Sequence, residues 1–276
     1  MAQGSGRRKG GGTSGHHKEE AEEHARLPTR TVYEVVRREG QEEMERPSVS
    51  LWWSGFAAGL SISFSLLAQA ILSQALPTTT WTPLITGFGY CVGFIMVILA
   101  RQQLFTESTI TVILPLLAEF TRRNVFLSLR MWAIVLVANV AGTLFAAVFC
   151  SFTPVLTPDI RHAMLVIAGH AMAFNWWQML FRGISAGFLM AVMVWLIPSA
   201  ENTKFHVVIL ITYLIAIGGF SHIVAGSMES FMLVSAGSLS ISQMLLGFFV
   251  PVLVGNIIGG TVLFGVLSYA QVMKEI

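Results

Sequence analysis

One of the long apolar stretches of the chain is interrupted by a short segment that contains small residues and a histidine. The segment covers residues 218–229 and begins Gly-Gly-Phe-Ser-His, and it interrupts apolar sequence that begins near Phe205 and resumes toward Val234. Adjacent glycines disfavour a continuous helix, and irregular backbone inside a bilayer is tolerated only where protein covers it or water reaches it. An ionisable side chain at this depth indicates a functional site, so His222 is a candidate for a permeation path.

The chemistry available to His222 suits a small anion. A monovalent anion loses much of its hydration energy when it enters a medium of low dielectric. A histidine can lower that barrier by donating a hydrogen bond or a proton near neutral pH. We hypothesise that His222 assists a weak-acid anion between two apolar constrictions. The alternative is a structural histidine that stabilises the broken backbone.

A second interruption lies in the first half of the chain. Apolar sequence from Trp81 to Ala100 is followed by the polar residues 101–107, and a half-helix is expected to resume over 108–120. Arg101 and Glu107 bracket this break. They are expected to form a local ion pair that compensates for the interrupted helix.

Composition places these breaks in a membrane protein. The chain has 276 residues, 54% hydrophobic and 12% charged, and nine of the 17 basic and nine of the 15 acidic residues precede residue 50. The remaining apolar runs reach the roughly 20 residues that a spanning helix needs. The sequence therefore predicts an all-α, polytopic membrane protein with a cytoplasmic tail (1–48) and a transmembrane channel domain (49–276).

The tail and the cysteines exclude several classes of partner. Residues 1–26 are expected to be disordered, and 31–44 to form an amphipathic helix, either on the membrane surface or solvated. The tail carries both signs of charge, so no nucleic-acid partner is expected. Cys91 and Cys150 lie in apolar runs and indicate neither a disulfide framework nor a metal site.

Six spans fit the pattern best. Residues 162–181 could form a full span, but Asn175 is a good N-cap and tryptophans follow it, so an interfacial helix and then a span from Asn175 are preferred. Six spans place both termini on one side, and the distribution of Lys and Arg assigns that side to the cytoplasm. The predicted spans are 52–76, 81–120, 131–150, 175–198, 205–234 and 244–272, with the second and fifth interrupted.

The two halves resemble each other. Residues 55–59 resemble 183–187, and the Asn139 and Asn256 segments lie 117 positions apart, an offset that places His222 opposite Phe105. Three spans per half would give an inverted repeat, and paired interrupted helices in such a repeat indicate a substrate path near the midplane.

The order of three short segments is similar to a known family: 104–106 (Leu-Phe-Thr), 219–222 (Gly-Phe-Ser-His) and 254–260 (Val-Gly-Asn-Ile-Ile-Gly-Gly). The chain resembles the formate/nitrite transporter family over about residues 30–276. The resemblance implies an aquaporin-like fold and a homopentamer in the bacterial inner (plasma) membrane. It also implies a pore in each protomer for small monovalent anions such as formate, nitrite or hydrosulfide. His222 would be the central pore residue, between a cytoplasmic constriction of Leu104, Phe105, Thr106 and Met190 and an outer constriction of Tyr90, Phe94 and Ile215.

The chain departs from the family at several polar positions. Ser221 stands where the family has a glutamate, Gly226 and Gly187 where it has asparagines, and Ala171 where it has a lysine. Charged residues that could act as a charge relay occur elsewhere at or near membrane depth: Arg101, Glu107, Arg182 and Glu229. We hypothesise that Arg182 replaces the missing lysine in attracting anions. The competing interpretation makes it an ion-pair partner of Glu229 or Glu107.

Other functions fit less well. A pore for neutral solutes would be consistent with the absence of the family's lysine and glutamate, but no paired Asn-Pro-Ala motif occurs at the breaks. A non-conducting scaffold or sensor could use the tail but would not need His222. The sequence has no His-Glu-x-x-His helix, no Gly-x-Ser-x-Gly elbow and no cofactor motif, so an enzyme is not expected. Transport of a small monovalent anion without a cofactor is the favoured interpretation.

Overall fold

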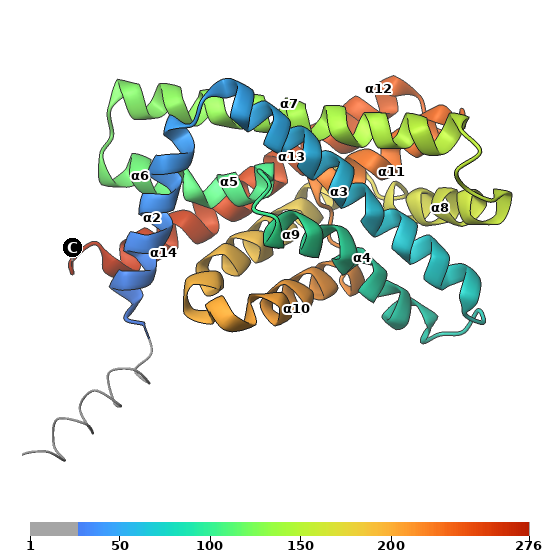
Figure 1. The fold of residues 1–276 in the computed structure, drawn as a ribbon, viewed down its shortest axis with the longest axis horizontal. Helices are drawn as coiled ribbons and strands as arrows, with labels where there is room; N and C mark the ends of the chain where they lie inside the picture. The colour runs from blue at the N-terminus through green and yellow to red at the C-terminus, as the bar shows by residue number, and fades with distance from the viewer. Residues whose placement is uncertain (1–26, 276) are drawn as a thin grey trace, which may run out of the picture.

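The computed structural model describes residues 27–275, and every element within that range is helical (Figure 1). The predicted disorder of residues 1–26 concerns residues outside this range. Five helical stretches are long and apolar enough to cross a membrane: Ser48–Ala75, Thr82–Leu99, Arg122–Phe152, Trp176–Ile217 and Ile241–Val272. Two shorter apolar helical stretches, Phe105–Ala118 and Ile223–Ser235, follow the two interruptions. The chain is therefore an all-α membrane protein.

The first helix of the described range, α2 (Thr29–Glu45), packs on the protein itself. Its apolar face, which includes Val32, Tyr33, Val36 and Met44, is buried, and α2 contacts α5, α6, α7 and α9. The apolar face of α2 is therefore covered by protein, and its position relative to a membrane surface stays a prediction. An amphipathic pattern shows that one face avoids water, but it does not distinguish lipid from protein as the cover.

The first half of the bundle follows the predicted order with shifted boundaries. The half-helix after the first break begins at Phe105 rather than residue 108. The third long helix begins at Arg122 rather than residue 131, because the Thr121 side chain accepts a hydrogen bond from the Asn124 N–H and caps it. The elements are α3 (Ser48–Ala75), α4 (Thr82–Leu99), α5 (Phe105–Thr111), α6 (Ile113–Ala118) and α7 (Arg122–Phe152).

In the second half, a separate helix precedes a long helix that begins after Asn175, as predicted. Asn175 and Gln178 form a reciprocal capping box at this start, which satisfies two backbone N–H groups. The elements are α8 (Pro158–Ala171), α9 (Trp176–Leu196), α10 (Lys204–Ile217), α11 (Ile223–Ser235), α12 (Ile241–Gln243), α13 (Val250–Ile257) and α14 (Val266–Val272). A 3₁₀ segment, Ile197–Thr203, joins α9 to α10, and π-helical turns, Met244–Phe249 and Ile258–Gly265, flank α13.

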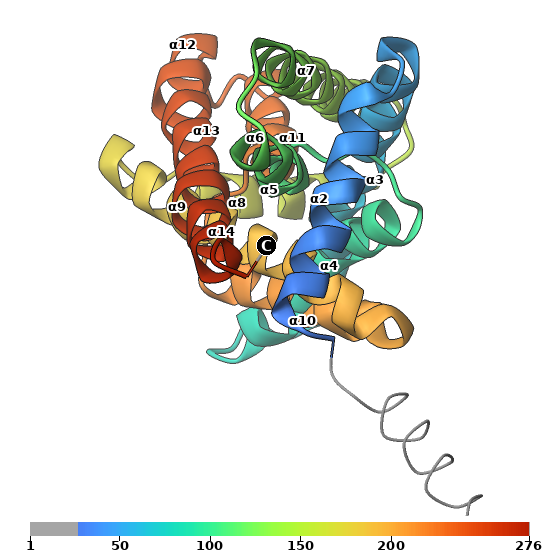
Figure 2. The ribbon, with the colours of Figure 1, turned by 90° about the vertical axis from the view of Figure 1, so that its left-hand side faces the viewer.

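The short helices that follow the breaks lie inside a ring of longer ones. Figure 2 shows α5 and α11 near the centre of the end-on view, with α3, α7, α9 and α13 around them. Glycines allow the longer helices to approach closely: a methyl group on Gly59 would lie 2.2 Å from the Asn139 carbonyl oxygen, and one on Gly187 would lie 2.3 Å from that of Asn256. Small residues at helix crossings permit such contact in membranes. Both asparagines are fully buried as a result.

Candidate pore and its central histidine

The two breaks have the same backbone conformation. Arg101 and Gly219 are left-handed, with φ of 52° and 61°. Leu104 and His222 are extended N-caps, with φ/ψ of −111°/128° and −107°/126°. The members of each pair are 118 positions apart, so His222 corresponds to Leu104. The offset of 117 between the asparagines had predicted Phe105 instead. A non-glycine residue in this conformation costs about 1 kcal/mol, a cost that arises at Arg101 and not at Gly219.

The Asn139 side chain supplies hydrogen-bond partners to backbone groups at the first break. Its Oδ1 accepts a hydrogen bond from the Phe105 N–H at 2.9 Å. Its Nδ2 donates to the carbonyl oxygens of Gly55 at 2.8 Å and Gln103 at 2.9 Å. One amide therefore holds the start of α5, the loop before it and the neighbouring helix α3.

Asn256 does the same at the second break. Its Oδ1 accepts from the Ile223 N–H at 2.9 Å. Its Nδ2 donates to the carbonyl oxygens of Gly183 at 2.8 Å and Ser221 at 3.0 Å. This role was not predicted from the sequence, where the two asparagines served only to align the halves. Their similar distances along the chain from the breaks, 34 and 33 residues, were the available signal.

The predicted ion pair between Arg101 and Glu107 is absent. The Arg101 side chain is 84% exposed, and its Nη2 lies 3.9 Å from Glu39 Oε1 on α2. Glu107 lines a partly open cavity whose lining also includes Arg101, but no ion pair joins the two side chains. The broken backbone needs no local ion pair because Asn139 already satisfies its N–H and carbonyl groups.

Arg182 stabilises the second break rather than pairing with an acid. Its Nε donates to the Gly219 carbonyl oxygen at 2.8 Å, and its Cζ lies 3.6 Å from the centre of the Phe174 ring. No ion pair joins it to Glu229 or Glu107, so that interpretation was wrong. Its guanidinium group also lines the cavity that contains His222.

His222 connects the two breaks. The ring is 2% exposed. Its Nδ1 accepts a hydrogen bond from the Ala225 N–H at 3.2 Å, and its Nε2 lies 2.7 Å from Thr106 Oγ1. Because Nδ1 accepts, the hydrogen of the neutral ring is assigned to Nε2, which then donates to the Thr106 hydroxyl. Phe94 packs edge-on against the ring, with 5.0 Å between ring centres.

Two cavities approach this region from opposite ends of the same helices. The first, here called the histidine cavity, has a volume of about 230 Å³ and is lined by His222, Glu229, Tyr90 and Ile215 among others. The second, here called the α2 cavity, has a volume of about 400 Å³ and is lined by residues of α2, α4, α5 and α9. On α4, Tyr90 faces the first and Ile98 the second, and eight residues of helix separate them by about 12 Å.

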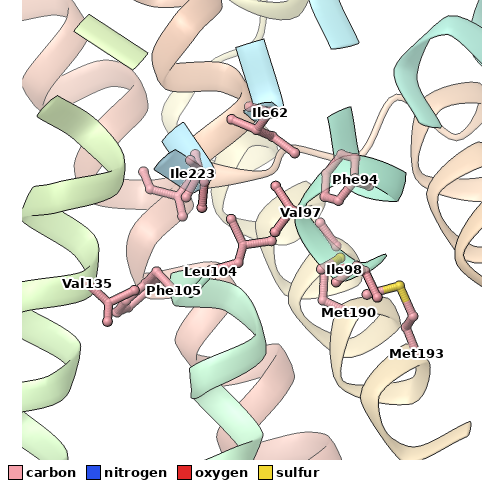
Figure 3. Packing of buried hydrophobic residues seen from close by; sticks show 14 of the residues in the cluster. Ile62, Phe94, Val97, Ile98, Leu104, Phe105, Val135, Met190, Met193 and Ile223 are labelled. Atoms are coloured by element: carbon pink, nitrogen blue, oxygen red, sulfur yellow. The ribbon is translucent and has the colours of Figure 1, made fainter. Parts of the chain in front are cut away.

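Apolar side chains close the space between the two cavities. Leu104, Phe105, Phe94 and Met190 are each at most 1% exposed and belong to one buried cluster. Figure 3 shows Leu104 and Met190 within this packing, together with Val97 from α4. Thr106 is fully buried directly beside His222. His222 therefore lies at the boundary between the histidine cavity and the apolar cluster.

The α2 cavity contains a direct link from α2 to the first break. Glu43 Oε1 accepts a hydrogen bond from Gln103 Nε2 at 2.9 Å, and Oε2 accepts one from Thr111 Oγ1 at 3.2 Å. Burial raises the pKa of Glu43 above its usual range, although these two hydrogen bonds lower it in part. The charged side chains that face Glu43 or share its cavity are Glu39, Glu42, Arg46, Arg101, Glu107 and Lys204.

The docking of α2 is expected to depend on pH through Glu43. A carboxyl group whose pKa is raised by docking favours the docked state at low pH. This contribution is lost as the pH rises from about 4.5, the usual value, through the raised pKa. The protection factors of α2 amides, corrected for the intrinsic pH dependence of hydrogen exchange, should rise between about pH 7.5 and about pH 5, and E43Q should remove most of that rise. E42Q is the matched control, and an unchanged pH dependence in E43Q would contradict the assignment.

Comparisons with known proteins give the family. Residues 30–270 match the family model described as formate/nitrite transporter. The inner membrane protein YfdC of Escherichia coli is 42% identical over 252 residues, which cover 91% of this chain and 81% of the relative. The formate channel FocA of Haemophilus influenzae is 26% identical over 250 residues, 81% of this chain and 87% of the relative. Relatives named as transporters and channels indicate a transport protein rather than an enzyme.

Solved structures agree on the fold. A pentameric formate channel with formate bound superposes with a TM-score of 0.67 at 19% identity, over 82% of this chain and 98% of that chain. A structure described as an FNT family ion channel gives a TM-score of 0.72 at 19% identity, over 88% and 98% of the two chains. Together with the match over residues 30–270, these findings show that the chain belongs to the formate/nitrite transporter family.

Proposed function

We propose that the chain forms a pore in each protomer of a homopentamer and moves a small monovalent weak-acid anion, such as formate or nitrite, across a bacterial inner membrane. The observation that carries the proposal is the place of His222, whose ring lines a cavity at the edge of a closed apolar cluster. The formate channels among the relatives support the substrate class, and the solved pentamer supports the assembly.

The hydrogen bonds of His222 favour a donor over an acid. A protonated ring would direct an N–H from Nδ1 at the Ala225 N–H, so it would lose the bond that caps α11. The neutral ring keeps this bond, and its Nε2–H donates to the Thr106 hydroxyl. An anion that displaces the Thr106 hydroxyl from Nε2–H gains a hydrogen bond that stabilises its charge at the constriction, while a proton must come from another group.

The distribution of charge supports an orientation. Arg122, Arg123 and Arg130 begin α7 on the side where α2 docks: Arg123 lies 3.1 Å from Glu45, and Arg130 donates to Ser48 at 3.2 Å. Basic residues favour the cytoplasmic side, so the α2 cavity is the inner vestibule and the histidine cavity the outer one. Leu104, Phe105, Thr106 and Met190 then form the inner constriction, and Tyr90, Phe94 and Ile215 the outer one.

Flux through purified protein in liposomes tests the proposal. The panel contains formate, nitrite, hydrosulfide, acetate and glycerol, with protein-free liposomes as the reference. We expect formate and nitrite to enter faster than the reference, and glycerol to match it. Glycerol flux without formate flux would indicate a pore for neutral solutes, and no flux of any solute would indicate a scaffold or sensor.

A further inference from the structure

Glu229 is the one carboxyl group among the described residues that line the histidine cavity. It is 8% exposed, so it is more than nine-tenths buried. It follows His222 by seven residues on α11, which is two helical turns, about 10 Å along the axis and on the same face. The cavity therefore contains an acid some two turns from the central histidine.

This carboxyl group has no protein partner within the described range. No hydrogen bond or ion pair reaches its oxygens, and Arg182, the one Arg or Lys among the described residues that line the cavity, is held by the Gly219 carbonyl and the Phe174 ring. The other titratable groups that face the cavity are Tyr90, His170 and His222, and both ring nitrogens of His222 are already engaged. The carboxyl oxygens are not among the side-chain atoms that are both fully enclosed and unpaired, so they open onto the cavity. A solute that occupies the cavity can therefore reach them.

An anion that enters this cavity meets the carboxyl group at short range. Two negative charges confined to about 230 Å³ between mostly apolar walls repel strongly. Two carboxylates that share a small site do not both ionise, and they hold one proton between them. A carboxylate-like anion and Glu229 are therefore placed to share a proton while the anion occupies the histidine cavity, where the Arg182 guanidinium group offsets only part of their repulsion.

We propose that Glu229 is the group that gives the transported anion its proton, an inference that rests on the proposed function. The O–H bond of the Glu229 carboxyl breaks and an O–H bond forms on the anion, so the neutral acid leaves toward the constriction and a carboxylate stays behind. A proton from water on the same side then restores the carboxyl group. His222 contributes a hydrogen bond and no proton.

The mechanism selects a class of solute. The solute must be the conjugate base of a weak acid with an oxygen that accepts a proton, as formate and nitrite are. The anion of a strong acid, such as nitrate, cannot share the proton and remains excluded by charge. Formamide has nearly the size and shape of formate without its charge, so it should pass without involving Glu229.

The test compares E229Q, E229D and the wild type in liposomes, with E201Q, an exposed carboxyl outside both cavities, as the matched control. A step that requires one proton changes up to about tenfold per pH unit. Wild type, E229D and E201Q should therefore take up formate at least about tenfold faster at about pH 5.5 than at about pH 7.5, after subtraction of protein-free uptake. In E229Q the ratio should fall below about threefold, with formamide flux equal in all four proteins.

Three outcomes would overturn this role. The first is an equal pH ratio in E229Q and wild type. The second is wild-type nitrate uptake as fast as nitrite uptake. The third needs no variant: formate entry into wild-type liposomes without acidification of a trapped pH dye. Wild-type protein that moves neither formate nor nitrite at any pH would instead contradict the proposed function, so the two failures are distinguishable.

Discussion

Replacing His222 by phenylalanine is expected to lower formate and nitrite flux by about 10- to 100-fold, with assembled protein still recovered in detergent. The ring is the polar side chain that reaches from the histidine cavity to the Thr106 hydroxyl at the apolar cluster. A hydrogen bond to a charged group contributes about 1.5–3 kcal/mol, which corresponds to that range of rates. Phenylalanine keeps the volume and apolar packing beside Phe94 but removes both ring nitrogens.

His222 also caps α11, so a second variant must separate this structural role from transport. Asparagine is a strong N-cap and can accept the Ala225 N–H that His222 Nδ1 accepts now. His222→Asn should therefore assemble and melt like the wild type, yet transport as poorly as His222→Phe. His206→Phe, an exposed histidine at the start of α10, is the control for the substitution itself. Wild-type flux in the asparagine variant would reduce His222 to a helix cap.

The positions of both breaks could be predicted because their signals are local. Glycines and a histidine inside apolar sequence disfavour a helix, and the polar residues after Ala100 do the same. The start of α9 was also local, since the capping box of Asn175 and Gln178 lies within four residues. These features depend on the backbone preferences of the residues themselves and on side chains within a few positions along the chain.

The connections between the breaks and the rest of the fold could not be predicted in this way. The sequence suggested that Arg101 and Glu107 compensate the first break, because they are adjacent to it. Asn139 does so from 34 residues beyond Phe105, and a lone asparagine in an apolar run does not identify its partners. Glu229 was noted as a charge at depth, but its free oxygens and its cavity depend on helices from across the chain. Docking of α2 likewise depends on Gln103 and Thr111, which the amphipathic pattern of α2 does not reveal.

Replacing Asn256 by leucine is expected to cause a larger loss of stability than replacing any other single polar residue at the second break. The change leaves the Ile223 N–H and the carbonyl oxygens of Gly183 and Ser221 without their partner. The Gly183 carbonyl oxygen keeps its intrahelical donor within α9, so two groups are left unpaired. Each costs about 1–3 kcal/mol, and the total is about 2–6 kcal/mol. Water does not replace the amide where apolar helices cover the break. We expect little assembled protein and a strongly lowered melting temperature by size-exclusion chromatography after heating.

The two breaks are held by the same pattern of asparagine hydrogen bonds, so the prediction applies to Asn139 as well. Asn139→Leu removes the same three kinds of hydrogen bond at the first break, so its loss of stability should match that of Asn256→Leu. Asn124→Leu is the control on the same helix as Asn139. Asn124 lies in the first turn of α7, and its side chain makes a single hydrogen bond, to the Glu119 carbonyl oxygen. It should melt close to the wild type. If Asn139→Leu and Asn256→Leu also melted there, the breaks would be held by apolar packing of the short helices, and the asparagines would serve neither half of the pore.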